Sequence, residues 1–364
     1  MQRNEFERLQ VDIASTLVHP RLVVVSTSPP NAETRLAHHR GVITPNEAFY
    51  VRSHFPTSHI DRSTWRLDVE GDVERPLSLT FEDLLALPTR TLLVTLECAG
   101  NGRSAMRPQP VGEPWGYGAV SSAEWTGVPL RTVLAAAGLA PSVSNVVIEG
   151  ADRGYVPDTS QTIPYARSLP LSQALHPDTL LAYGMNGEEL APVHGFPVRL
   201  IVPGWYGMAA VKWVMRIRAR SHPFTGFYQV ERYTMTPQVD GQSAGVPLSL
   251  IRTRSVISEP VADTTLPCGE HRVRGFAWSG AAPIAQVEVS IDGGTVWETA
   301  ELTSRPEPYL WAHWEYQWRA EVRGPAELLS RAFDAAGNGQ PAEPEWNRLG
   351  YANNAIQTVH VLVT

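Results

Sequence analysis

The apolar positions of this chain fall mostly in short runs or in strict alternation, and both patterns are typical of β-strands. Residues 93–96, 146–152 and 198–202 form mostly apolar runs that predict buried strands. Residues 65–75 alternate as a strand with one exposed face does, and the aromatic segment 49–51 also predicts a strand. The pattern therefore favours a strand-rich or mixed fold over a helical bundle.

Helical periodicity is confined to short segments. Thr80 can cap a short helix within residues 79–87, and residues 130–138 predict a helix that Gly138 ends. The pair Asn186-Gly187 predicts a tight hairpin turn. Thirty prolines and 28 glycines add many turns and irregular connections, which again suits a strand-rich or mixed fold.

From about residue 241 onward, the chain changes to short alternating strands separated by glycine-containing turns. This spacing predicts an immunoglobulin-like β-sandwich, although the Cys–Trp–Cys pattern of true immunoglobulin domains is missing from the sequence. We therefore expect an irregular N-terminal arm at 1–40, a first domain at 41–240 and a sandwich domain at 241–364. The strands expected in the sandwich are 273–280, 286–294, 313–322, 328–338 and 358–363.

Charge and composition exclude several classes of protein. The chain has 30 basic and 37 acidic residues, a net charge of −7, so no nucleic-acid partner is expected. An anionic ligand would need a local basic pocket. No apolar run approaches the roughly 20 residues that span a bilayer, and the N-terminus has no signal-peptide core or twin-arginine leader. We expect no membrane association and a cytoplasmic protein, or a periplasmic one if a leader was removed.

Cys98 is the main candidate for chemistry. The two cysteines, Cys98 and Cys268, lie in different halves of the chain, so zinc spacing, iron–sulfur spacing and a disulfide framework are not expected. Cys98 follows a predicted strand, begins a turn that contains two glycines, and lies shortly before Arg103. This setting suits thiolate or soft-metal chemistry, and the alternative is a buried cysteine that acts as a small hydrophobe.

Other candidates are ambiguous when each is considered alone. Arg52 and His54 fall on the same side of a predicted strand, but they also fit a surface arginine and a strand-end histidine. Asp152 ends a buried strand, where an aspartate usually caps a turn. Tyr233 lies in an aromatic segment, where packing is the common role, and Lys212 alone would be a solvated lysine.

Taken together, the motifs resemble the sulfite oxidase family of molybdenum enzymes over residues 40–364, and the likeness is to a haem-less, bacterial-type member. The motifs are, in chain order, YVRSH, ECAGNGRSAM, EGAD, HGFPVR, VKW and WNRLG. The resemblance implies an α+β fold. In this fold, a mixed α/β molybdopterin-binding domain of the sulfite oxidase type is followed by an immunoglobulin-like dimerisation domain.

The resemblance also assigns roles to single residues. Cys98 matches the cysteine that binds molybdenum, and it is expected to be the only protein ligand of the metal. Arg52, Arg103 and Tyr233 match positions that orient the anionic substrate, and Arg348 is a further candidate. An anionic, phosphate-bearing molybdopterin gives a reason for the basic residues among the motifs. The residues expected to bind this cofactor are Tyr50, Val51, Arg52, Ser53, His54, Cys98, Asp152, His194, Arg199, Ala210, Val211 and Lys212.

The activity implied by the resemblance is oxidation of sulfite to sulfate by oxygen-atom transfer. Electrons would pass to an external one-electron acceptor such as a cytochrome, and the second domain would form a homodimer. Two alternatives stay open. One is another oxo-transferase on the same scaffold, such as a nitrate or sulfoxide reductase, and the other is a non-enzymatic β-sandwich interaction protein without the cofactor.

Four positions depart from the family pattern. Family members commonly carry two arginines after CAGN, and here the first is Gly102. Val111 replaces a basic residue, Arg232 replaces an aspartate of the animal enzymes, and the arginine of the last motif is displaced by one position to Arg348. Because these positions lie where anion specificity is set, the sequence determines the substrate less well than the fold or the cofactor.

Overall fold

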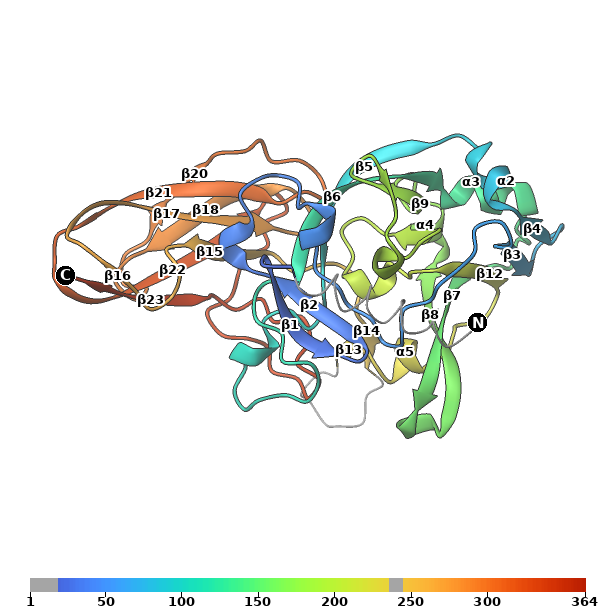
Figure 1. Ribbon diagram of the computed structural model, residues 1–364, viewed down its shortest axis with the longest axis horizontal. Coiled ribbons are helices and arrows are strands. Elements are labelled where there is room, and N and C mark those ends of the chain that lie inside the picture. Colours follow the sequence, from blue (N-terminus) through green and yellow to red (C-terminus); the bar gives the residue numbers. More distant parts are fainter. Residues whose placement is uncertain (1–18, 236–244) are drawn as a thin grey trace.

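The computed structural model describes residues 19–235 and 245–364. Figure 1 shows two lobes along the long axis, a β-sandwich built from the C-terminal part of the chain and a larger mixed domain. The predicted boundary at residue 240 and residues 1–18 of the predicted arm lie outside the described residues.

One antiparallel sheet of the first domain carries the strand that leads to Cys98. Its strand order is β10-β9-β6-β5, and β11 also pairs with β9. Asn186 (φ 53°) and Gly187 (φ 78°) form the turn between β9 and β10, which confirms the predicted hairpin. The strands are β5 (Arg90–Glu97), β6 (Val120–Pro129), β9 (Leu180–Met185), β10 (Glu188–Glu189) and β11 (Arg199–Ile201).

A second sheet of the first domain has the strand order β4-β3-β12-β7-β8. Its pairings are antiparallel except for the parallel pairing of β3 with β12. The strands are β3 (Leu67–Gly71), β4 (Leu77–Leu79), β7 (Asn145–Val156), β8 (Gln161–Pro170) and β12 (Val214–Arg220).

Short helices connect these strands. The Thr80 side chain accepts a hydrogen bond from the Asp83 amide and the Asp83 carboxylate accepts one from the Thr80 amide, so the predicted cap is confirmed. None of the helices in the described part of the chain has the length and apolar character needed to cross a membrane. The α-helices are α2 (Phe81–Leu85), α3 (Leu130–Ala137), α4 (Leu171–Ala174) and α5 (Phe227–Val230). The 3₁₀ helices are Leu36–His38, Asn46–Ala48, Arg103–Ala105, Pro157–Thr159, Pro192–His194 and Gly207–Ala209.

The two sheets of the first domain share one apolar core. Leu67, Val146 and Ile217 from one sheet belong to the same buried cluster as Val128 and Leu200 from the other. Burial of such a side chain is worth roughly 1.5–3 kcal/mol. The core therefore fixes the two sheets, and the loops that leave them, relative to one another.

The N-terminal segment is more regular than the sequence predicted. β1 (Leu22–Thr27) and β2 (Pro30–Thr34) form an antiparallel hairpin, so the predicted irregular arm is corrected for this part of residues 19–40. The β-branched run of β1 favours a strand. Pro29 lies in the turn and Pro30 begins β2, where a proline that excludes a helix is still compatible with a strand.

The predicted strand at residues 49–51 is wrong. The 3₁₀ helix Asn46–Ala48 precedes this segment, and only Val51 forms a bridge, with Ala32 of β2. The segment is extended but forms no ladder beyond this bridge, and Phe49 and Tyr50 line a cavity.

The second domain is the predicted β-sandwich. Its sheets have the orders β15-β17-β21-β20 and β16-β23-β22-β18-β19. Val273 and Trp314 from the first sheet pack with Val287, Ala332 and Val361 from the second. The strands are β15 (Arg254–Glu259), β16 (Thr264–Leu266), β17 (Gly269–Trp278), β18 (Ile284–Ser290), β19 (Glu298–Thr299), β20 (Glu301–Leu302), β21 (Ala312–Ala320), β22 (Gly324–Asp334) and β23 (Thr358–Val363).

The two domains are joined by direct backbone contacts. β13 (Thr234–Met235) pairs with β14 (Val246–Pro247), close to where the chain passes from one domain to the other. Further along, the Ala352 amide donates to the Ala99 carbonyl at 2.8 Å. A segment that follows the sandwich strands β21 and β22 therefore returns to the loop that carries Cys98.

Candidate active site

Strand β5 ends at Glu97 and presents Cys98 in a tight turn. The Cys98 amide donates to the Ala119 carbonyl at 2.8 Å, and the Asn101 amide donates to the Cys98 carbonyl at 2.9 Å. Gly102 adopts φ 80°, in the left-handed region that glycine reaches without steric cost. The Cys98 thiol is free, and the residue is 6% exposed at the meeting point of two cavities.

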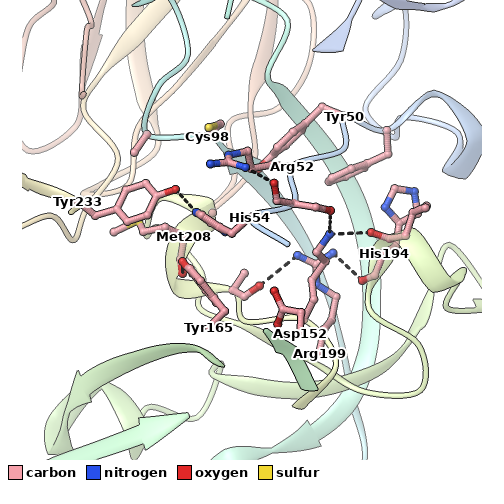
Figure 2. Close-up of a pocket in the computed structure, with 17 residues that line it drawn as sticks. Tyr50, Arg52, His54, Cys98, Asp152, Tyr165, His194, Arg199, Met208 and Tyr233 are labelled. Atoms are coloured by element: carbon pink, nitrogen blue, oxygen red, sulfur yellow. Dashed lines mark hydrogen bonds between the residues drawn. The ribbon is translucent and has the colours of Figure 1, made fainter. Parts of the chain in front are cut away.

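We call these the inner and the outer cavity. They contain about 620 and 1200 Å³ of empty space, and both are lined by Arg52, His54, Cys98 and Tyr233. Figure 2 shows the inner cavity, with Cys98 and Arg52 at one end and Asp152 and Arg199 at the other. The inner cavity is lined further by Phe49, Tyr50, Ser53, Ala99, Asp152, Tyr165, Val193, His194, Arg199, Gly207, Met208, Ala210 and Lys212.

Lys212 and Asp152 supply ionisable groups deep in the inner cavity. Lys212 Nζ donates to Ser53 Oγ and to the Val193 carbonyl, both at 2.9 Å. Burial lowers the pKa of Lys212, and burial raises the pKa of Asp152 to about 7 against the opposing effect of Lys212. Asp152 Oδ1 is buried without a hydrogen-bond partner among the residues the structure describes, so it is available to a ligand.

Arg199 and His194 lie beside this pair. Arg199 Nη1 donates to the His194 carbonyl at 2.9 Å, Nη2 donates to the Ala210 carbonyl at 3.4 Å, and the guanidinium carbon lies 4.8 Å from the centre of the Trp125 ring. Burial lowers the pKa of Arg199 to about 10 and the pKa of His194 to about 3. The histidine is therefore neutral, and its Nε2 donates to the Asn46 carbonyl at 3.0 Å. Arg199 remains a buried cation at neutral pH.

The outer cavity presents two arginines beside Cys98. Arg52 Nη1 donates to Asn31 Oδ1 at 3.3 Å and to the Ser53 carbonyl. Arg103 Nε donates to the Leu349 carbonyl at 2.9 Å. In the described part of the chain, these hydrogen bonds go to amide and carbonyl oxygens and not to carboxylates. Neither arginine is therefore neutralised by an ion pair with a described carboxylate.

The Arg103 side chain lies in a space formed by three glycines. A Cβ atom at Gly100 would lie 2.7 Å from Arg103 Nη2, one at Gly112 would lie 3.0 Å from Nη1, and one at Gly350 would lie 2.7 Å from Cγ. The Tyr351 ring centre is 5.2 Å from the guanidinium carbon. These contacts hold the Arg103 guanidinium at the wall of the outer cavity.

Tyr233 and His54 meet at the boundary between the two cavities. The Tyr233 hydroxyl is hydrogen bonded to His54 Nε2, and the His54 ring stacks on Tyr165 with 4.3 Å between the centres. Burial raises the pKa of Tyr233, and burial followed by the charge of Arg52 lowers the pKa of His54. Both groups are therefore neutral at physiological pH, and they can add hydrogen bonds without adding charge.

The structure does not bring every predicted residue to the cavities. Arg348 is exposed and lines neither cavity, because Asn347 hydrogen bonds to the Tyr351 backbone and the turn directs Leu349 and Tyr351 inward instead. Val51 and Val211 are buried but are absent from the lining residues. Val51 instead forms the bridge to β2.

Several lining residues carried no sequence signal. Tyr165, Met208, Tyr228 and Tyr351 come from separate elements, and the sequence gives no spacing that relates them to Cys98. Asn31 accepts hydrogen bonds from Arg52 and from the Ser53 amide, and it lies in the N-terminal hairpin, where the sequence predicted an irregular arm.

The donor set fits a cofactor that brings most of the metal ligands with it. In the described ranges, 19–235 and 245–364, no three His, Cys, Asp or Glu side chains gather as a metal site. A single cysteine can therefore complete a metal site only if the other ligands belong to a bound group. The buried cations and the unpartnered Asp152 Oδ1 and Arg199 Nε suit an anionic group with phosphate and polar ring atoms.

Comparisons with known proteins agree with this geometry. Residues 54–228 match the family described as an oxidoreductase molybdopterin binding domain, and residues 248–364 match the Mo-co oxidoreductase dimerisation domain. Sulfite oxidase of Gallus gallus is 37% identical, and the alignment covers 93% of this chain and 77% of that protein. Mitochondrial sulfite oxidase of Homo sapiens is 38% identical, covering 95% of this chain and 66% of that protein.

A solved structure supports the fold as well. The sulfane dehydrogenase SoxCD from Paracoccus pantotrophus superposes with a TM-score of 0.82 at 32% identity, covering 92% of this chain and 85% of that chain. Fold and site together define a two-domain oxidoreductase that carries the molybdenum–molybdopterin cofactor. The chain belongs to the sulfite oxidase family, as its motifs indicated.

Proposed function

We propose that this enzyme oxidises sulfite to sulfate and passes the two electrons singly to an external acceptor. The observation that carries the proposal is the placement of Arg52 and Arg103 beside Cys98, with carbonyl and amide partners only. Two guanidinium groups that lack carboxylate partners in the described structure give an anion a local positive field in a protein of net charge −7.

The inner cavity is proposed to hold the cofactor. Asp152, His194, Arg199 and Lys212 line its deep end and would bind the pterin and its phosphate, and Cys98 would be the protein ligand of the metal. When bound, the cofactor supplies a two-electron redox centre and the transferred oxygen atom. The net change converts sulfite and water to sulfate, two electrons and two protons.

The outer cavity is proposed to hold the substrate. Arg52 and Arg103 would orient the anion with charge-assisted hydrogen bonds, and Tyr233 would add a neutral one. Neutral His54 holds the Tyr233 hydroxyl in place. Such preorganised donors lower the barrier most where charge changes during the reaction.

The second domain is proposed to form a symmetric homodimer, which the dimerisation-domain match supports. The cytochrome as acceptor and the cytoplasmic location stay predictions. Light scattering at micromolar concentration should give the mass of a dimer, and a monomeric mass would contradict this part of the proposal.

The direct test is steady-state turnover of the molybdenum-replete enzyme. We expect sulfite-dependent reduction of ferricyanide or cytochrome c, with competition by sulfate. Reduction of nitrate at a comparable kcat/KM, without sulfite oxidation, would reject sulfite as the substrate and would support the nitrate reductase alternative.

A further inference from the structure

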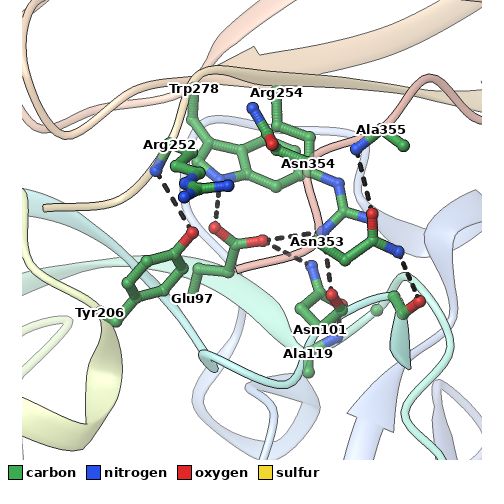
Figure 3. A network of polar contacts seen from close by, with 12 residues as sticks. Glu97, Asn101, Ala119, Tyr206, Arg252, Arg254, Trp278, Asn353, Asn354 and Ala355 are labelled. Carbon is green, nitrogen blue, oxygen red and sulfur yellow. Dashed lines mark hydrogen bonds and ion pairs between the residues drawn. The ribbon is translucent and has the colours of Figure 1, made fainter. Parts of the chain in front are cut away.

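The residue before Cys98 is a buried acid that is held by the second domain. Glu97 is 2% exposed. Its Oε1 accepts from Arg254 Nη1 at 3.1 Å and its Oε2 accepts from Trp278 Nε1 at 2.9 Å, and Figure 3 shows both partners. Arg254 begins β15 and Trp278 ends β17, so both belong to the sandwich.

The same arginine also holds the other side of the cysteine turn. Arg254 Nη1 donates to the Asn101 carbonyl at 3.1 Å, and the Asn101 side chain donates back to Glu97 Oε1 at 2.9 Å. Arg254 is itself 1% exposed. One guanidinium therefore connects the residue before Cys98 with a residue three positions after it.

Gly102 makes the room for this guanidinium. A Cβ atom at Gly102 would clash with Arg254 Nη2 and would lie 3.2 Å from Asn353 Nδ2. Asn353 Nδ2 in turn donates to the Gly102 carbonyl at 2.8 Å. The turn thus fits around two side chains that follow residue 245, and the glycine that departs from the family pattern is the position that admits Arg254.

We infer that Arg254 is a positioning residue for Cys98, through which the second domain completes and fixes the metal-binding loop of the first domain. The first domain holds this turn at the Cys98 amide and at Asn101 Oδ1, both through Ala119, and Arg254 adds a bond to the Asn101 carbonyl from the second domain. The glycines on both sides of Asn101 give the turn a permissive backbone, so each of these bonds matters for the position of Cys98. A metal ligand that is loosely held exchanges and reacts more easily.

A purely stabilising role can be separated from a positioning role. Removing one partner of a buried ion pair destabilises strongly, because the other charge stays buried, whereas replacing both partners is often neutral. The double variant Glu97→Gln/Arg254→Met should therefore recover thermal stability. It does not recover the hydrogen bond from Arg254 Nη1 to the Asn101 carbonyl.

The experiment uses the purified holoenzyme in a Cys268→Ser background, where Cys98 is the sole thiol. Three quantities are measured: the Tm, the rate of molybdenum loss well below the Tm, and the rate of Cys98 alkylation by iodoacetamide. The matched control is Arg252→Met. That residue lies two positions before Arg254, forms an ion pair with Glu345 of the same domain at 2.6 Å, and lines neither cavity.

We expect Arg254→Met to lose molybdenum and to react with iodoacetamide at least tenfold faster than the parent, and Arg252→Met to stay within twofold. The double variant should regain a Tm close to the parent and still lose molybdenum at least fivefold faster. The inference would be overturned if the double variant recovered both the parental Tm and the parental rate of molybdenum loss. It would also be overturned if Arg254→Met lost molybdenum and reacted with iodoacetamide at the parental rates.

If Arg254→Met does not fold, Arg254→Lys decides the question. Lysine keeps the charge but lacks the Nη1 position from which the guanidinium donates both to Glu97 Oε1 and to the Asn101 carbonyl. Faster molybdenum loss at an unchanged Tm supports the inference, and parental loss rejects it. These experiments measure the rate of molybdenum loss and the reactivity of the Cys98 thiol. Their outcome therefore does not depend on whether sulfite is the substrate.

Discussion

The Tyr233 hydroxyl is hydrogen bonded to His54 Nε2, which joins residues 179 positions apart at the boundary of the two cavities. The Tyr233 ring also stacks on Tyr351 with 4.9 Å between the centres. A tyrosine that would be packing in isolation therefore has its hydroxyl at the boundary between the inner and the outer cavity.

Replacement of Tyr233 by phenylalanine tests this placement. The ring contacts stay and the hydroxyl is lost, so Tyr233→Phe should keep the fold and the molybdenum content. We expect kcat/KM for sulfite to fall roughly tenfold or more, as for loss of one hydrogen bond near the reacting group. Steady-state kinetics with metal content on the same sample provide the measurement, and an unchanged kcat/KM would remove Tyr233 from the substrate site.

Cys98→Ser tests the metal ligand. Serine is close in volume, so the Tm should stay near that of the parent and pterin should remain bound through the inner cavity. Because a hydroxyl is a poor soft-metal ligand, we expect sulfite oxidation to fall by about a hundredfold or more. Turnover like that of the parent would show that the thiolate is not required.

Arg52→Gln and Arg103→Gln test the anion pocket. Each change removes a charge from the outer cavity, and we expect a loss of about 1–3 kcal/mol in kcat/KM with nearly unchanged molybdenum. Turnover of the parent should also weaken as ionic strength rises. The control is Arg131→Gln, at an exposed position of α3, which should behave as the parent. If kcat/KM decreased only in proportion to the molybdenum content, these arginines would be assigned to cofactor binding instead.

Arg199→Ala tests the proposed binding site of the cofactor in the inner cavity. The change removes a buried cation and its two carbonyl contacts, and it should cost about 2 kcal/mol or more in cofactor retention. Molybdenum and pterin per chain should therefore decrease after purification. Arg216→Ala is the matched control, because Arg216 pairs with Glu70 and Glu149 on the second sheet and lines neither cavity. If Arg199→Ala purified with full molybdenum and pterin occupancy, a role of Arg199 in cofactor binding would be rejected.

His39 predicts a dependence of stability on pH. It lies between Phe276 and Trp311, and both ring nitrogens lack hydrogen-bond partners among the described residues. Burial, followed by the charge of His313, lowers the pKa of His39 from 6.5 to about 3. Below pH 6.5 the unfolded chain therefore binds a proton that the folded chain does not, so stability is lost as the pH falls from 6.5 towards 3.

In His39→Phe this contribution is absent. The difference in the free energy of unfolding between pH 8 and pH 5 should shrink by about 2 kcal/mol relative to the parent. Denaturant unfolding at the two pH values measures it, with His38→Phe, an exposed neighbour, as control. An equal pH dependence in His39→Phe and the parent would contradict the burial of a neutral histidine.

The local elements and the chemistry of single residues could be predicted from the amino-acid sequence. The hairpin at Asn186-Gly187 and the cap at Thr80 were predictable, because turns and caps depend on residues a few positions apart. The sandwich followed from strand spacing alone. Cys98 was identifiable because its motif is continuous in the chain.

Which distant groups share the site became known from the three-dimensional fold alone. The sequence assigned Arg348 to the substrate pocket. In the structure, hydrogen bonds from Asn347 fix a turn that directs Leu349 and Tyr351 inward instead. Which residue of a loop faces a cavity depends on such contacts, and a shift of one position changes it. Arg254 pairs with Glu97 from 157 positions away, and no spacing rule relates residues of two domains. Burial supplies the physical reason, because the partners of a buried charge are fixed by packing in three dimensions and not by distance along the chain.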